Sequence, residues 1–119
     1  MRYLLLIYGE PPAAPPTPEE WAEMMPKYYA FTSWLRDQGW YEGGEALADI
    51  ASATTVSVRD GNRTVTDGPF AETKEHLGGY YLINAPSLDD AIEAASRVPG
   101  AEYGKVEVRP VVDTGGSPA

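Results

Sequence analysis

The sequence predicts a single α+β domain in which two helices cover one face of an antiparallel sheet. The chain has 119 residues, a length that suits one hydrophobic core. Its apolar content of 43% and aromatic content of 11% are typical of a globular domain. Short β-type runs and two helix-type segments follow one another in the order strand, helix, strand or hairpin, strand, helix, strand. This order is typical of a split βαβ arrangement.

The first strand is predicted over residues 2–8, because Arg2–Tyr8 is an almost continuous apolar run. Such a run is typical of a central strand that is covered on both faces, or on one face by a partner. Residues 9–16 contain four prolines, which fix φ and remove hydrogen-bond donors. This segment is therefore predicted to be a stiff surface linker.

A helix is predicted to begin at Thr17, because Thr17, Pro18 and Glu20 form a capping box with proline at the first helical position. Gly39 is predicted to end the helix at the position where a left-handed residue is favoured. Pro26 lies in the interior, where proline costs about 3 kcal/mol, so we expect a kink or a break into two pieces there. The apolar stripe of this helix consists of Trp21, Met24, Met25, Tyr28, Phe31, Thr32 and Leu35.

The middle of the chain is predicted to contain a hairpin. Residues 40–49 are expected to be irregular or weakly extended. Val56 and Val58 alternate with polar residues, and Asp60-Gly61-Asn62 is turn chemistry that leads into residues 63–66. Residues 79–84 are predicted to form the next strand.

A second helix is predicted after Ser87, which is a favoured capping residue, and it is expected to stop at Pro99-Gly100. Residues 105–111 alternate in polarity and are predicted to form the last strand. The domain is therefore assigned to residues 1–112, and residues 113–119 are predicted to be a frayed tail. The expected apolar stripe of the second helix consists of Leu88, Ala91, Ile92, Ala95 and Val98.

Composition narrows the range of functions. Nine basic and eighteen acidic residues give a formal charge of −9, which argues against binding to nucleic acid or to an anionic membrane. The chain has no cysteine and no metal-ligand spacing, so no metal and no cofactor are predicted. The opening apolar run is too short for a signal peptide or a membrane span, so a cytoplasmic location is expected.

The arrangement predicts a homodimer. If both helices lie on one face of the sheet, the other face is left as a bare apolar surface rich in Leu, Ile, Val and Tyr. A second copy packed on that face would remove it from water.

The segment Asp67-Gly68-Pro69-Phe70 is predicted to be a tight turn, in which Gly68 can adopt a positive φ. Two interpretations remain open. The turn is either a structural corner that lets Phe70 fill the core, or part of a binding or catalytic site.

The polar and aromatic residues around this turn have the same two interpretations, a structural role or a place in a binding or catalytic site. Glu72, Lys74 and His76 are either a solvated loop or part of a site, and histidine is the residue type that titrates near neutral pH. Tyr28 and one of Tyr80 and Tyr81 either pack in the core or line a pocket, because adjacent strand residues face opposite sides. Arg59 and Arg109 either clamp a carboxylate or offset acidic surface. The residues predicted to bind a ligand are Asp67, Gly68, Pro69, Phe70, Glu72, Lys74, His76, Tyr28 and Tyr80.

Residues 67–81 and their flanks resemble the YCII-related family, in particular its DGPF branch, which is named after the tetrapeptide Asp67–Phe70. The flanks that agree are residues 3–8, 31–39, 43–47 and 106–110. The resemblance implies a ferredoxin-like fold in a dimeric α/β-barrel arrangement with a cleft. Other members are thought to use a His–Asp pair near the first helix, where this chain has Tyr28 and no histidine.

The resemblance does not imply an established reaction. The leading hypothesis is a dimeric small-molecule-binding or enzymatic domain, whose cleft lies between the sheet face and residues 67–76 and whose ligand is a compact cyclic or carboxylated metabolite. The alternative is an accessory protein that binds another protein, such as an extracytoplasmic-function sigma factor.

Overall fold

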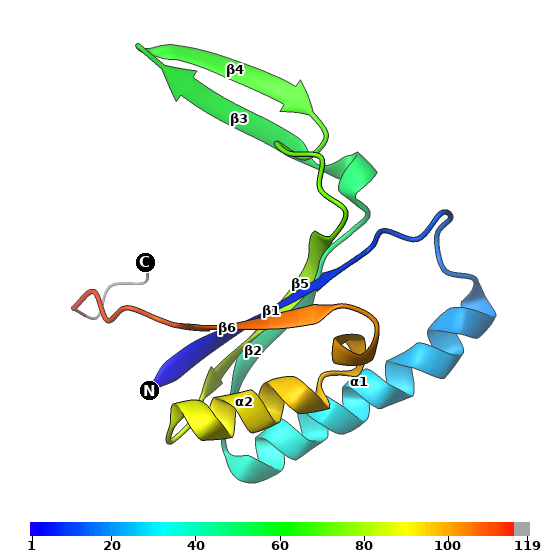
Figure 1. Cartoon of the computed structure of the whole chain (residues 1–119), viewed down its shortest axis with the longest axis vertical. Helices are drawn as coiled ribbons and strands as arrows, with labels where there is room; N and C mark the ends of the chain where they lie inside the picture. The colour runs from blue at the N-terminus through cyan, green and yellow to red at the C-terminus, as the bar shows by residue number, and fades with distance from the viewer. Residues whose placement is uncertain (116–119) are drawn as a thin grey trace.

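The computed structural model describes residues 1–115 and contains a four-stranded antiparallel sheet with two helices on one of its faces (Figure 1). The strand order is β2-β5-β1-β6, so the main elements follow one another along the chain as βαββαβ. The predicted α+β class with antiparallel pairing is confirmed. The main elements are β1 (Arg2–Gly9), α1 (Pro18–Gln38), β2 (Tyr41–Ala46), β5 (His76–Asn84), α2 (Leu88–Arg97) and β6 (Lys105–Pro110).

The first strand is central, as its apolar run predicted. Leu5 lies opposite Tyr81 of β5 on one side and opposite Val108 of β6 on the other. Because side chains alternate along a strand, Tyr3, Leu5 and Ile7 all face the helices. The β1–β5 register shifts between Ile7 and Tyr8, at the end of the strand from which the proline-rich linker leaves.

The core lies between the sheet and the two helices. Leu5, Leu35 and Ile83 have no exposed surface, and α2 contributes small alanines that let it lie close to the sheet. Ring contacts extend the core toward the β2 edge, where the Phe31 ring meets the Tyr81 ring edge-on at 5.0 Å between centroids.

Helix α1 begins and ends where the sequence predicted. Thr17 and Glu20 exchange two hydrogen bonds of 3.1 and 3.2 Å in a capping box, and Gly39 ends the helix with φ 77°. The expected break at Pro26 is wrong, because one helix of 21 residues runs through it. Pro26 and Ala22 are both exposed, so the carbonyl that loses its amide partner can bind water instead.

The structure refines two further expectations about the sheet. Residues 41–46, expected to be irregular or weakly extended, form the regular edge strand β2 and pair with β5. The predicted hairpin forms as β3 (Thr54–Arg59) and β4 (Asn62–Asp67), but it is a separate two-stranded sheet that projects away from the main sheet (Figure 1). Short 3₁₀ helices at Ile50–Ser52 and Pro99–Glu102 complete the connections.

The buried stripe of α2 differs from the expected one. Ala91, Ala94 and Ala95 are buried, whereas Leu88 and Ile92 are 50% and 48% exposed. Ala91, Ala95 and Val98 are buried as expected, and Ala94 joins them in place of Leu88 and Ile92, so small residues form most of the packed face of the helix.

The face of the sheet that points away from the helices carries Leu4, Leu6, Tyr80 and Leu82, as the register requires. Within residues 1–115 neither helix covers this face (Figure 1). No helix in the described part of the chain is long and apolar enough to cross a membrane. Of the predicted tail, residues 113–115 have no regular structure, and residues 116–119 lie outside the described residues.

Candidate functional site

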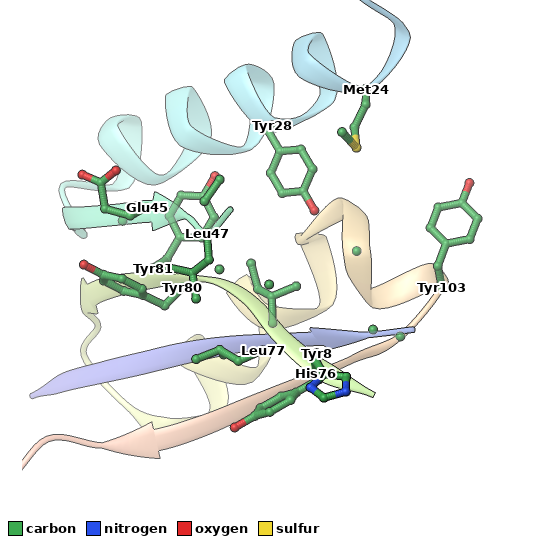
Figure 2. Close-up of a pocket in the computed structure, with 18 of the residues that line it drawn as sticks. Tyr8, Met24, Tyr28, Glu45, Leu47, His76, Leu77, Tyr80, Tyr81 and Tyr103 are labelled. Atoms are coloured by element: carbon green, nitrogen blue, oxygen red, sulfur yellow. The ribbon is translucent and has the colours of Figure 1, made fainter. Parts of the chain in front are cut away.

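A cleft of about 860 Å³ opens between α1, the ends of β1 and β5, and the edge strand β2 (Figure 2). In this view Met24 and Tyr28 point from α1 toward the sheet, Glu45 and Tyr81 lie at one end, and Tyr103 lies at the other. The volume falls within the usual range for small-molecule sites, about 300–1,000 Å³. The larger apolar side chains of the lining are Ile7, Tyr8, Trp21, Met24, Met25, Tyr28, Tyr29, Tyr41, Leu47, Ile50, Leu77, Tyr80, Tyr81 and Tyr103.

The apolar stripe of α1 explains why this cleft is lined by large side chains. The buried residues of α1, Phe31 and Leu35, lie in its C-terminal half, where the helix packs on the sheet. In the N-terminal half Met24 and Met25 are only partly buried, and Trp21 is 43% exposed. One continuous stripe therefore serves the core at one end and the cleft at the other.

Three hydroxyl groups lie at the inner wall of the cleft. The Tyr81 hydroxyl is 3.3 Å from Thr32 Oγ1, and Tyr28 is partly buried beside Gly100. Burial raises the pKa of both phenols, and each is raised further by a neighbouring tyrosine, Tyr81 for Tyr28 and Tyr41 for Tyr81. Both phenols are therefore neutral at physiological pH, where they can donate and accept hydrogen bonds.

Gly44 of β2 allows the Tyr81 ring to reach this position. A Cβ atom at Gly44 would lie 2.7 Å from the Tyr80 carbonyl oxygen and 2.9 Å from Tyr81 Cδ1. A side chain at this position would therefore displace the ring or the strand. Gly44, one of the two glycines that weaken the strand pattern of this segment, thus has a packing role at the edge of the cleft.

The charged residues of the cleft are acidic. Its lining contains Glu10, Glu45, Asp49 and Glu75, and within residues 1–115 it contains no lysine or arginine. Glu10 forms an ion pair with Lys74 at 3.3 Å, and Glu75 forms one with Lys105 at 2.6 Å. Both lysines are largely exposed and lie outside the lining.

The structure separates the predicted site residues into two groups. Tyr28, Tyr80 and His76 line the cleft, Tyr28 from α1 and Tyr80 from the face of β5 that points away from the helices. His76 is half-buried at the start of β5, opposite Gly9, and its ring has no hydrogen-bond partner among the described residues. The predicted residues that lie outside the lining are Asp67, Gly68, Pro69, Phe70, Glu72 and Lys74.

The Asp67–Phe70 segment forms a corner at the base of the hairpin. Gly68 has φ 94°, as predicted; its amide donates to the Ala53 carbonyl at 2.7 Å, and its carbonyl accepts from Thr55 Oγ1 at 2.8 Å. The expectation that this corner lets Phe70 fill the core is wrong, because Phe70 is 89% exposed. The corner connects the hairpin to the domain, and it leaves the Phe70 ring in solvent.

The two arginines considered as carboxylate clamps are both remote from the cleft. Arg59 is at the tip of the hairpin, where it donates to the adjacent Val58 carbonyl at 3.3 Å. Arg109 is on β6 and pairs with Glu107. Among the described residues, no group of three acidic or histidine side chains is placed to hold a metal ion.

Sequence reasoning missed several residues of the cleft, notably Met24, Tyr41, Glu45, Leu47 and Tyr103. The sequence did indicate Met24, because the apolar stripe of α1 is longer than the part of the helix that can pack on a small sheet. Glu45, Leu47 and Tyr103 gave no signal, because their place in the cleft depends on the β2–β5 pairing and on the turn after α2.

The fold and the cleft together define a small βαββαβ domain with an aromatic-lined side cleft and an uncovered sheet face. The chain belongs to the family of the YCII-related domain, whose model matches residues 1–114. It is also similar to an uncharacterised protein of Rhizobium meliloti (strain 1021), with 45% identity over 67 residues. That match covers 55% of this chain and 54% of the relative, so the chain spans about half the length of the relative.

Proposed function

We propose that this YCII-related domain binds a small organic molecule in the cleft between α1 and the edge of the sheet. The observation that carries the proposal is the cleft of about 860 Å³, whose lining is mostly apolar, includes eight aromatic side chains and two methionines, and has a few polar groups. Such a composition is typical of small-molecule sites, where apolar walls bind the ligand and few polar groups orient it. The neutral hydroxyls of Tyr28 and Tyr81 supply these orienting groups.

Among the residues predicted from the sequence, Tyr28 and His76 are the ligand contacts in this proposal, because both line the cleft. Tyr80 also borders the cleft, but its side chain lies on the face of the sheet that points away from the helices. Asp67, Glu72 and Lys74 lie outside its lining, and we assign them to the corner and the loop that connect the hairpin to β5. Membership of the DGPF branch is part of the same proposal and rests on the tetrapeptide Asp67–Phe70.

A neutral fluorescent probe, N-phenyl-1-naphthylamine, tests this proposal. We expect its emission to rise and shift to the blue when it enters the cleft, and we expect the substitution Met24→Trp, which fills the space, to weaken binding at least tenfold. Ala22→Trp is the matched control, because Ala22 is exposed on the same helix and lies outside the cleft. Equal binding by wild type and both variants would contradict the proposal.

We also propose that two copies form a homodimer through the open face of the sheet. Leu4 and Leu82 lie on this face and are partly exposed, and Leu6 lies on it with 9% of its surface exposed. This face carries no helix within residues 1–115. A contiguous apolar patch of this kind is commonly covered by a second subunit. Light scattering at micromolar concentration is expected to give twice the mass of the chain, and Leu4→Arg is expected to give the monomer mass with an unchanged circular dichroism spectrum. A monomeric wild type would refute the dimer.

The alternative function is that of an accessory protein for a partner such as an extracytoplasmic-function sigma factor. The observation that favours it is the projecting hairpin, on which Val56, Val58 and Val65 share one face and are each more than half exposed. Hydrogen exchange with a purified sigma factor of this type tests it. Protection of β3 and β4 would support the alternative, and unchanged exchange at saturating sigma factor would refute it for that partner.

A further inference from the structure

The hairpin β3–β4 has an apolar face that its own chain leaves uncovered. Val56 pairs with Val65 across the two strands, and Val58 is two residues further along β3, so the three side chains share one face. Each of them is more than half exposed, and all six residues of β4 are exposed. The two strands pack mainly on each other, and a two-stranded hairpin alone is only marginally stable in water. A partner on this valine face would stabilise the hairpin and remove the valines from water.

The hairpin lies on the same side of the molecule as the open face of the sheet. In Figure 1 the sheet separates the hairpin from α1 and α2, so the hairpin stands on the side to which the open face is turned. The Gly68 corner holds the base of the hairpin through its hydrogen bonds with Ala53 and Thr55. A partner that covers the open face therefore comes within reach of the hairpin, and one partner can cover both apolar surfaces.

The open face alone is small for a stable interface. Its four strands are six to nine residues long, and alternate residues face each side, so it presents roughly fifteen side chains. A standard interface takes about 20–30 residues from each partner. In addition, β6 contributes the charged residues Lys105, Glu107 and Arg109 to this face. A dimer through the sheets therefore needs a further contact, which the hairpin can supply.

Charge favours a second copy as the partner of the hairpin. Residues 54–67 contain two arginines and two aspartates, so the formal charge of −9 lies entirely on the rest of the chain. Arg63 is on the valine face, opposite Val58, and its side chain forms no ion pair within residues 1–115. Two acidic copies repel each other, so a hairpin without net charge and with an unpaired arginine is the part of one copy best suited to approach the other.

We infer that the hairpins of the homodimer are arms, and that each arm packs the valine face of Val56, Val58 and Val65 on the partner copy while the two sheets face each other. The two-fold symmetry of a homodimer makes this contact reciprocal, so both arms are covered at once. The inference rests on the proposed homodimer and adds a second contact surface to it. Residues 51–74 contribute nothing to the lining of the cleft, so the arm contact is separate from the ligand site.

Val65→Arg and Thr64→Arg form a matched pair, because both add one charge at exposed neighbouring positions of β4, on opposite faces of the hairpin. The dimer dissociation constant of the full chain is measured by sedimentation velocity over a range of concentrations. We expect Val65→Arg to raise it at least tenfold, because a charge would be buried against apolar groups, and Thr64→Arg to change it less than threefold. The circular dichroism spectrum and the binding of N-phenyl-1-naphthylamine should be unchanged in both variants.

Isotope-filtered NOE spectra of a dimer of labelled and unlabelled copies test the same contact without a substitution. We expect NOEs from the methyl groups of Val56, Val58 and Val65 in the labelled copy to protons of the unlabelled copy. A dimer that lacks these NOEs, or that binds equally tightly in wild type and Val65→Arg, would overturn the inference and leave the sheet-to-sheet dimer intact. Hairpin amides that become protected only when a purified sigma factor is added would also overturn it, in favour of the alternative partner. A monomeric wild type would overturn both the arm contact and the dimer.

Discussion

Replacing Pro26 by alanine should stabilise this protein. Pro26 lies nine residues into α1, where it removes one backbone hydrogen bond to the Ala22 carbonyl and its ring crowds the preceding turn. Its side chain is exposed, so the substitution removes little packing. The helix is already continuous through this position, so alanine can adopt the backbone that proline occupies without rearrangement.

The expected magnitude is about 2 kcal/mol. In a helix interior alanine is favoured over proline by about 3 kcal/mol. The proline also restricts the unfolded chain, and losing that restriction costs roughly 0.4–1 kcal/mol. An unfolding entropy of about 2.1 cal/mol/K per residue over 119 residues converts the difference to a rise of roughly 8 °C in Tm.

Thermal unfolding followed by circular dichroism at 222 nm measures this change, at one protein concentration because a dimer would make Tm depend on it. Lys27→Ala is the control, since Lys27 is the exposed neighbour of Pro26 and alanine and lysine have similar helix propensities. A Tm that is unchanged or lower in Pro26→Ala, with a neutral control, would refute the reasoning. It would mean that the helix accommodates Pro26 at little cost.

Three further outcomes follow from the structure. Because burial raises the pKa of Tyr28 and Tyr81, the folded state keeps their protons at a pH where the unfolded chain has lost them. The free energy of unfolding should therefore be constant near neutral pH and fall above pH ~10. Urea denaturation at several pH values should show a smaller fall for Tyr81→Phe than for the wild type. Gly104→Ala should cost at least 2 kcal/mol in the same assay, because its Cβ would overlap the Tyr8 carbonyl oxygen; a cost below 0.5 kcal/mol would show that the strand end yields. Phe70→Ala should change stability by less than about 0.5 kcal/mol, since Phe70 is 89% exposed, and a loss typical of a core phenylalanine, about 3 kcal/mol or more, would show that the ring is covered in solution.

The secondary structure could largely be predicted because its signals are local. The Thr17 capping box, Gly39 and Ser87 fix the helix ends through hydrogen bonds to residues at most four positions away. The hairpin turn at Asp60-Gly61 is likewise determined by the two residues that adopt positive φ. Strand β2 was predicted only as an irregular or weakly extended segment, because its glycines disfavour a strand locally and its pairing with β5 stabilises it.

The candidate site could be predicted only in part. Tyr28, Tyr80 and His76 line the cleft, whereas Asp67–Lys74, the most recognisable segment of the sequence, lies outside its lining. A turn motif is visible in a sequence because its residue types are distinctive, even where its role is to join two elements. Glu45 is an ordinary residue of a weak strand, and its position beside Tyr80 comes from pairing across 35 residues of chain.

By itself the sequence determined the fold class, the ends of both helices, the central place of β1 and the absence of cysteine chemistry, because each depends on residue type and on near neighbours. The tertiary structure alone decided that the hairpin stands apart from the sheet, that Phe70 is exposed and that the N-terminal half of the α1 stripe borders a cleft. These features depend on which distant segments meet and on the space left between them. Local propensities carry no information about that space, which arises only when the helices have packed on the sheet.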